Sequence, residues 1–373
     1  MNDQDSLLVG TRKGLFTMRT HGGAWRPDRV DFLGEPVTAV VHDETSGRTW
    51  AALGTGHFGV HVWRREGGAS EWVEVASPTY PARPASATDV DPMRQEPVPW
   101  ATQMAWVLET GGPQRPDELW CGTIPGGLFR SRDGGDSWQL ERGLWDHEAR
   151  AQWFGGGYDW PGVHSVTPDP RDPNTIVAAA SCGGSWITRD DGATWEASTG
   201  MRADYVPPDA AMDPYTQDPH RVVRCLADPD VLWNQHHSGC YRSTDGGVMW
   251  EEIVERAPSV FGFAAAAHPT DPSTAWFVPA VADQLRVPVD GRFVASRTTD
   301  GGKSFDVLGD GLPDHDAYDL VYRHALDVDG TGEQLAMGST TGSLWATGNG
   351  GERWETVSAN LPPVNVVRFA SRG

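Results

Sequence analysis

The stretch SRDGGDSW, residues 131–138, decides the fold because closely related octapeptides return four more times along the chain. The later copies are TRDDGATW from residue 188, STDGGVMW from 243, TTDGGKSF from 298 and TGNGGERW from 347. Their third positions are Asp133, Asp190, Asp245, Asp300 and Asn349, which lie 57, 55, 55 and 49 residues apart. A period of about 50 in a chain rich in glycine and tryptophan is typical of β-propeller blades. Dividing the 373 residues by a mean spacing of about 54 predicts seven blades.

Each repeat can be divided into four short strands, called A to D here. In the fourth repeat these strands are VHSVTPDP (163–170), TIVAAASC (175–182), GSWITRD (184–190) and TWEAS (194–198). Their apolar residues alternate or run continuously, as in a buried sheet. The octapeptide then connects strand C to strand D, where its Ser or Thr and its Asp cap backbone N–H groups and a glycine supplies a positive φ. Because this position recurs in five copies, four with Asp and one with Asn, we interpret it as structural and not catalytic.

The two chain ends are predicted to share one blade. SLLVGT (6–11), GLFTMRT (14–20) and AWRPD (24–28) read as strands B to D, and VNVVRFAS (364–371) reads as the missing strand A. Such closure removes the free edge of a sheet. The sequence therefore predicts an all-β fold, a single seven-bladed β-propeller domain over residues 1–373 with a split closing blade.

Composition excludes several classes of partner. The formal net charge of −21 leaves no basic stripe, so we expect neither nucleic acid nor an anionic membrane surface as a partner. The N-terminus has no basic and apolar leader, and no apolar run approaches the roughly 18 residues of a membrane span, so we predict a cytoplasmic protein. The four cysteines form no CxxC pair and are expected to be buried free thiols: Cys121, Cys182, Cys225 and Cys240.

The octapeptide resembles the Asp-box, or BNR, consensus S/T-x-D-x-G-x-T/S-W. Over its whole length the chain resembles single-domain BNR-repeat propellers of the bacterial sialidase-like, or glycosyl-hydrolase-like, group. This resemblance implies the fold and leaves the activity open, because Asp boxes also occur in tandem-propeller xyloglucanases, in the sortilin ectodomain and in photosystem II assembly factors. Sialidases have six blades and an Arg-Ile-Pro signature that this sequence lacks, so the resemblance does not imply sialidase activity.

Long insertions are predicted to gather on one face of the propeller. The turns from B to C and the connections from D to A share that face, whereas the octapeptides lie on the other. The insertions cover residues 77–100, 140–163, 199–219 and 279–291. Long loops on a rigid scaffold usually carry function, so we predict a site at the mouth that they surround.

Histidines are concentrated near this mouth. His164 and His220 are expected near the starts of strand A in adjacent blades, and NQHHSG places His236 and His237 on a turn from B to C. We predict His164, His220 and His237 as ligands of one divalent transition metal, Zn, Cu or Fe, because three imidazoles with an open position suit these ions. His220 and His236 are also candidates for general acid and base. The alternative is that these histidines hydrogen-bond loop backbones, since no HxH or HExxH spacing supports a ligand set.

A carboxylate and two arginines are further candidates. Asp159 is the candidate orienting or proton-transfer group. Glycoside hydrolysis would require a second, opposed carboxylate, and spacing along the sequence does not give the separation of such a pair. Arg221 and Arg323 are candidates for binding a substrate anion, and pairing with loop carboxylates is the alternative.

Aromatic residues in one insertion complete the predicted site. Trp153, Tyr158 and Trp160 would line an apolar or sugar-stacking pocket, although packing of the loop onto the propeller explains them equally well. Together these residues predict an enzyme with hydrolase- or lyase-type chemistry on a small molecule or glycoside, assisted by a metal. Two alternatives stay open: a non-catalytic scaffold that binds a protein partner or assembly intermediate, and a carbohydrate-binding module.

Overall fold

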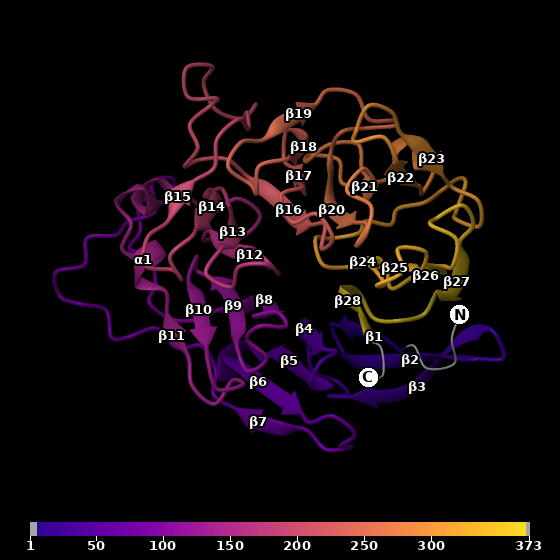
Figure 1. Ribbon diagram of the computed structural model, residues 1–373, viewed down its shortest axis with the longest axis horizontal. Coiled ribbons are helices and arrows are strands. Elements are labelled where there is room, and N and C mark those ends of the chain that lie inside the picture. Colours follow the sequence, from indigo (N-terminus) through magenta and orange to yellow (C-terminus); the bar gives the residue numbers. More distant parts are fainter. Residues whose placement is uncertain (1–5, 371–373) are drawn as a thin grey trace.

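Seven four-stranded antiparallel sheets surround a common centre in the computed structural model, which describes residues 6–370 (Figure 1). Each sheet is one blade, and the strand nearest the centre is strand A. The predicted seven-bladed propeller is therefore confirmed. Residues 77–100 form a long loop outside the strands, and Figure 1 shows a loop of matching purple colour that projects from the rim.

The blades are numbered in chain order. Blade 1 contains β28 (Val364–Ala370), β1 (Ser6–Thr11), β2 (Gly14–His21) and β3 (Ala24–Asp31), and blade 2 contains β4 (Val37–Asp43), β5 (Arg48–Gly54), β6 (Val60–Arg65) and β7 (Val73–Val75). Blade 3 contains β8 (Met104–Thr110), β9 (Leu119–Ile124), β10 (Leu128–Ser131) and β11 (Gln139–Leu140), and blade 4 contains β12 (Gly162–Pro168), β13 (Ile176–Ser181), β14 (Gly184–Thr188) and β15 (Glu196–Ala197). Blade 5 contains β16 (Pro219–Arg224), β17 (Leu232–His236), β18 (Gly239–Ser243) and β19 (Glu251–Ile253), and blade 6 contains β20 (Gly262–Ala267), β21 (Ala275–Pro279), β22 (Ala295–Thr298) and β23 (Asp306–Leu308). Blade 7 contains β24 (Leu326–Val328), β25 (Leu335–Gly338), β26 (Leu344–Thr347) and β27 (Glu355–Ser358).

The split closing blade is also confirmed. Strand β28 pairs antiparallel with β1, with Val367 opposite Val9. Val9 and Val367 are both fully buried, so the closure is part of the core and not a loose contact between chain ends. This pairing joins the first and last strands and leaves no open gap between blade 7 and blade 2.

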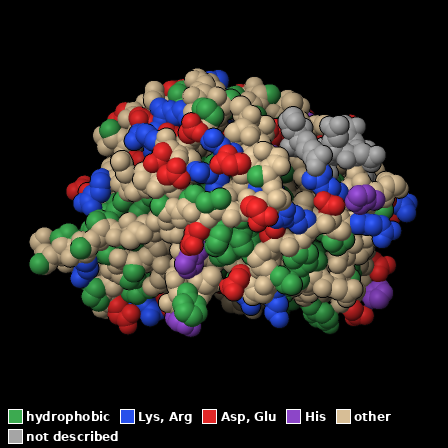
Figure 2. All heavy atoms as spheres, turned by 90° about the horizontal axis from the view of Figure 1, so that it is seen from below, with side chains coloured by type: hydrophobic (Ala, Val, Ile, Leu, Met, Phe, Trp, Pro, Cys, Tyr) green, Lys and Arg blue, Asp and Glu red, His purple; other side chains and the backbone are tan. Residues whose placement is uncertain are grey.

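Helices are short in the described residues. They are α1 (Arg142–Trp145), η1 (Gly56–Phe58), η2 (Glu148–Gln152) and η3 (Val289–Gly291). Across residues 6–370, none of them has the length and apolar character that crossing a membrane requires. Acidic and basic side chains are interspersed over the side of the disc drawn in Figure 2. The expectation of buried free cysteines is confirmed for all four of them.

The octapeptides form one repeated turn. In the first copy Ser131 Oγ accepts the Gly135 N–H at 2.8 Å, and Asp133 Oδ1 accepts the Ser137 N–H at 2.8 Å. Gly134 has a φ of +70°, in the left-handed region that favours glycine. The backbone N–H four residues after the third position is likewise bound in the other copies, at Asp190, Asp245, Asp300 and Asn349. The side-chain oxygens at the third position thus accept hydrogen bonds from the backbone of their own turn, as expected of turn residues.

We expect the Asp300→Asn variant to be less stable than the wild type at neutral pH and to lose less stability in acid. Hydrogen bonds from Ser304 lower the pKa of Asp300 to about 2, from an ordinary value of 3.8. A carboxyl with a lowered pKa stabilises the fold above its unfolded pKa and stops doing so as the pH falls from about 4 to 2. Asn349 makes the equivalent contact in the last repeat, so an amide is accepted there. The melting temperature of the variant should be below that of the wild type at pH 7, and the difference should shrink as the pH falls from about 4 to 2.

Strand A carries a bulge near its start in at least four blades. The register shifts between Val37 and Ala39 in β4, between Ala105 and Val107 in β8, between Val163 and Ser165 in β12 and between Pro219 and Arg221 in β16. The unpaired residues are Thr38, Trp106, His164 and His220. A bulge re-aims its side chain out of the strand alternation. These bulges therefore set the directions of the side chains at the start of the inner strands.

Candidate functional site

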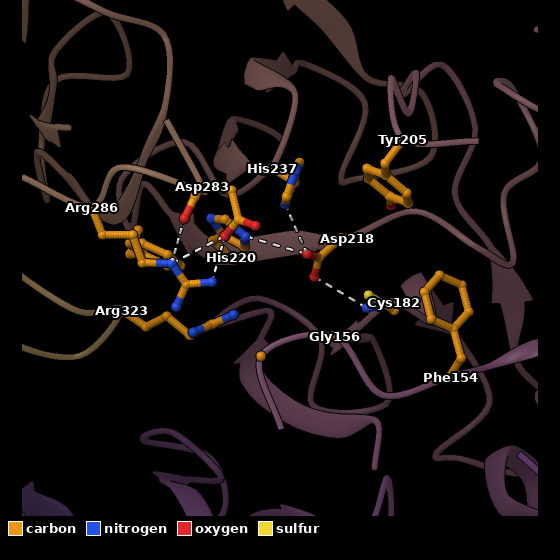
Figure 3. A pocket seen from close by; sticks show the side chains of 12 residues that line it. Phe154, Gly156, Cys182, Tyr205, Asp218, His220, His237, Asp283, Arg286 and Arg323 are labelled. Atoms are coloured by element: carbon orange, nitrogen blue, oxygen red, sulfur yellow. Dashed lines mark hydrogen bonds and ion pairs between the residues drawn. The ribbon is translucent and has the colours of Figure 1, made fainter. Parts of the chain in front are cut away.

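A cavity of about 150 Å³ lies among the insertions, close to the starts of the inner strands. Phe154, Tyr205 and Arg286, from three of the four insertions, line it (Figure 3). The propeller itself contributes His220 and Arg323, together with residues next to its strands. The pocket thus lies on the face where the sequence predicted a site, and the insertion 77–100 does not line it.

Asp218 links two histidines in this pocket. Its Oδ2 lies 3.3 Å from His220 Nε2 and 3.4 Å from His237 Nδ1, and the three ligand atoms all lie within 4.8 Å of one another. The backbone explains the convergence, because Asp218 comes directly before β16 and His237 directly after β17. The His237 N–H donates to the Asp218 carbonyl at 2.9 Å and holds the two ends together. Figure 3 shows both imidazoles directed at this carboxylate.

The tautomer of His220 is set by a backbone contact. Its Nδ1 lies 2.7 Å from the Gly262 carbonyl oxygen, which can only accept, so Nδ1 carries the proton. In a neutral imidazole the Nε2 lone pair then faces Asp218 Oδ2, and two acceptors face each other. A cation between them, either a proton on the imidazole or a metal ion, makes such a pair favourable.

Two of the three distances are compatible with a metal ion. Charge-assisted N–H···O bonds are about 2.7–2.9 Å long, shorter than both Asp218 contacts. Ligands bound to zinc at about 2.0–2.1 Å in tetrahedral geometry lie about 3.3–3.4 Å apart. The observed separations of 3.3 and 3.4 Å match this spacing. Two imidazole nitrogens and one carboxylate oxygen are a donor set that suits Zn, Cu or Fe.

The second oxygen of Asp218 is fixed by the preceding blade. Oδ1 accepts the Ser181 hydroxyl at 3.0 Å and the Cys182 N–H at 3.1 Å. Cys182 has a φ of +49°, an unusual conformation for a residue with a side chain, and the Asp218 contact helps to hold it. Oδ2 is therefore left to the imidazoles, and the carboxylate cannot rotate freely.

Electrostatics within the pocket keep Asp218 ionised. Burial would raise the pKa of Asp218, but His220, His237 and Arg323 outweigh burial and hold it well below its ordinary value. Burial lowers the pKa of His220, although Asp218 opposes this. For His237, the Asp218 contact outweighs burial and raises the pKa. The pocket thus holds a carboxylate beside one imidazole that burial keeps neutral.

His164 is not part of this group. It is fully buried, its Nδ1 contacts Ser165 Oγ at 3.0 Å, and its ring packs edge-on against Trp106 at 5.4 Å. Its Nε2 has no hydrogen-bond partner within residues 6–370. Where the sequence predicted His164 as a ligand with His220 and His237, the structure places Asp218 instead.

Two other candidates are buried away from the pocket. Both ring nitrogens of His236 face backbone N–H groups, of Asp218 at 3.1 Å and of Ser238 at 3.0 Å, and burial lowers its pKa to about 3. No nitrogen of His236 is thus directed at a substrate. Arg221 does not line the pocket; burial lowers its pKa to about 9, and the charges of Arg368 and Glu109 act on it.

The remaining candidates lie in the insertion 140–163 but do not line the pocket. Asp159 is exposed and pairs with Arg94 at 2.9 Å, so it is not positioned for the predicted proton transfer. Trp153 is buried and packs against Trp186. Trp160 is also buried and lies under the Arg94 guanidinium.

Tyr158 and the residues that the sequence reasoning missed lie closer to the site. Tyr158 is partly exposed and packs edge-on against Trp106 at 5.1 Å. Asp218 was missed, although it lies two residues before His220 in the stretch DPH, at the start of a predicted inner strand. Tyr205 and Cys182 also line the pocket, and no sequence signal pointed to them.

Comparisons with known proteins show the fold and a distant likeness to glycoside hydrolases. No family model matches the chain. An oligoxyloglucan-reducing end-specific xyloglucanase from Emericella nidulans is 30% identical over 165 residues, which are 40% of this chain and 19% of that protein. The chain therefore spans about a fifth of the length of this curated relative.

Solved structures resemble the chain at low identity. An ancestral GH74 enzyme has a TM-score of 0.56 at 15% identity, covering 90% of this chain and 38% of that chain. YCF48 bound to a D1 peptide has a TM-score of 0.54 at 15% identity, covering 93% and 90% of the two chains. These likenesses establish a seven-bladed propeller whose neighbours include both glycoside hydrolases and a peptide-binding protein.

Proposed function

We propose that the protein is an enzyme that acts on a small molecule in the pocket around Asp218, with hydrolase- or lyase-type chemistry. The carrying observation is the convergence of Asp218, His220 and His237, in which the two distances to Asp218 fit a divalent transition metal and all three ligand atoms lie within 4.8 Å of one another. An ion bound there would supply a Lewis acid and an activated water at neutral pH. The fixed tautomer of His220 and the anchored Oδ1 of Asp218 preorganise the three ligands.

The size of the pocket supports a small substrate. The inner cavity of about 150 Å³ adjoins an outer pocket of about 400 Å³, and His237, Tyr205 and Asp283 line both. The outer pocket gives access from solvent, whereas the inner cavity is too small for a polysaccharide chain. The substrate would therefore place its reacting group inside and the rest of its structure outside.

A two-carboxylate glycosidase mechanism has less support. Asp218 and Asp283 both line the inner pocket, but Asp283 is engaged by Arg286, whose Nε lies 3.1 Å from Asp283 Oδ1. A general acid needs a raised pKa and a free oxygen. The Asp-box resemblance of the repeats and the GH74 neighbours support a carbohydrate-like small molecule, without making Asp283 a catalytic acid.

A protein-binding scaffold is the second candidate, because YCF48 has the same fold and is described bound to a peptide. Strongly exposed apolar side chains would support this role if they formed one patch. The most exposed apolar side chains among the described residues belong to different blades or connections: Leu33, Phe58, Met93, Leu226, Val254 and Tyr318. The enzyme is therefore the better supported proposal.

Metal removal tests the proposed function. Protein treated with a chelator should take up close to one Zn²⁺ per chain, measured by calorimetry and by elemental analysis. Hydrolysis of small ester and glycoside substrates should disappear with the chelator and return with the metal. Failure to bind Zn²⁺, Cu²⁺ or Fe²⁺ at this site would overturn the metal-assisted mechanism.

A further inference from the structure

Arg323 brings a buried guanidinium to the pocket without an ionic partner. The residue is 6% exposed and precedes β24, and Figure 3 shows its side chain extending into the pocket near His220 and Asp218. The guanidinium carbon lies 4.7 Å from the ring centre of Trp106 and 5.3 Å from that of Phe263. Within residues 6–370 it makes no hydrogen bond or ion pair.

The neighbouring arginine shows what a structural role would require. Arg286 also lines the pocket, but its Nε donates to the Asp283 carbonyl at 3.0 Å and contacts Asp283 Oδ1 at 3.1 Å. Its charge is balanced and its orientation is fixed by that residue. Arg323 has aromatic faces around it, and Asp218 influences its charge through space without a direct ion pair.

A buried charge without a direct ionic partner lowers the stability of the folded protein. Contact with aromatic faces offsets only part of that effect. Burial lowers the pKa of Arg323, but a guanidinium stays protonated in proteins. Asp218 is nearby, but its oxygens are taken by Ser181, Cys182 and the two imidazoles. The missing partner is therefore an anion that binds the pocket from outside.

We propose that the substrate carries an oxyanion, a carboxylate or a phosphate, which docks on Arg323 while its reacting group lies at Asp218, His220 and His237. The inference deepens the proposed function and rests on the same pocket being the active site. A planar guanidinium binds both kinds of oxyanion with two parallel hydrogen bonds. Trp106 and Phe263 restrict the plane of the guanidinium and thereby orient the ligand.

Calorimetric titration with small probes tests the anion subsite. The probes are glycolate for a carboxylate, methyl phosphate for a phosphate and ethylene glycol as the neutral control, each added to metal-free and to Zn²⁺-loaded protein. We expect at least one anion to bind and ethylene glycol not to bind, and the stronger anion identifies the natural group. In the Arg323→Met variant the affinity for that anion should fall by about tenfold or more. Equal affinity in wild type and variant, or binding of neither anion, would overturn the proposal.

The melting temperature distinguishes an anion-binding role of Arg323 from a structural role. Metal uptake distinguishes failure of the anion subsite from failure of the metal chemistry. Arg323→Met should melt at or above the temperature of the wild type, because it removes an unpaired buried charge, whereas loss of a structural arginine lowers the melting temperature. The surface variant Arg189→Met, half-exposed and far along β14 from the pocket, should keep the wild-type anion affinity. Zn²⁺ uptake without anion binding would sink the anion subsite alone. Anion binding that depends on Arg323 without Zn²⁺ uptake would sink the metal chemistry alone.

Discussion

Replacing Asp218 with asparagine is expected to reduce metal affinity by more than about 100-fold and to abolish turnover. Loss of an outer-shell partner alone costs about 10–100-fold, and Asp218 supplies a ligand oxygen itself. Its Oδ2 is the atom that both imidazoles approach, at 3.3 and 3.4 Å. An amide oxygen carries no charge there, and the amide nitrogen cannot bind a metal. Competition with a chromogenic chelator measures the affinity, and circular dichroism checks that the variant is folded.

Two matched variants make this result specific. Asp283→Asn changes another carboxylate of the same pocket, one that is already paired with Arg286, and should leave metal affinity within a few-fold of the wild type. His164→Gln distinguishes the ligand set predicted from sequence from the one seen in the structure, and it should also retain the metal. Undiminished affinity in Asp218→Asn, or loss of the metal in His164→Gln, would show that the ion lies elsewhere.

The fold could be predicted from sequence because its signals are local and repeated. The octapeptide turn is fixed by contacts within five residues, such as Ser131 with Gly135, so each copy is readable by itself. The split blade was predictable because residues 6–28 supply only three strands of a blade, B to D, and residues 364–371 read as the missing strand A. Neither argument depends on the directions of individual side chains.

The site was predicted only in part because it depends on those directions. His220, His237 and Arg323 line the pocket, but His164 does not, although His164 and His220 are the bulged residues of adjacent inner strands. A bulge breaks the alternation from which orientation is inferred. His236 and His237 are neighbours in sequence, yet one ends β17 inside the protein and the other begins the turn beside Asp218.

Loop residues were still harder to place. Asp159 and Trp153 belong to a long irregular insertion, in which no period relates sequence to direction. Asp159 meets Arg94 from another insertion, a contact between residues 65 positions apart. Nothing in the sequence indicates that these two loops contact each other.

The second large effect is expected at Arg130, where replacement by methionine should lower the free energy of unfolding by about 3–5 kcal/mol. The Arg130 side chain is 1% exposed, and its Nε donates to Glu118 Oε2 at 2.8 Å. It also donates to the Asp191 carbonyl at 3.1 Å and pairs with the Asp191 carboxylate. Methionine fills much of the same volume but leaves Glu118, 5% exposed, as a buried charge with a weaker partner. Equilibrium unfolding in urea measures the difference.

The link from Arg130 to Asp191 joins blade 3 to the octapeptide of blade 4, and Arg64 makes the equivalent link from blade 2 to Gly134 at 2.9 Å. Arg64 is 20% exposed and its carboxylate partners are more so, hence Arg64→Met should cost only about 1 kcal/mol or less. In the double variant Arg130→Met with Glu118→Gln, the buried Glu118 charge is removed together with its partner and the more distant Glu141, 4.0 Å from Arg130, loses a cation, so the loss should be smaller than in Arg130→Met alone. A double variant as unstable as the sum of both singles would mean that Arg130 acts through packing on Trp120, and not through its charge.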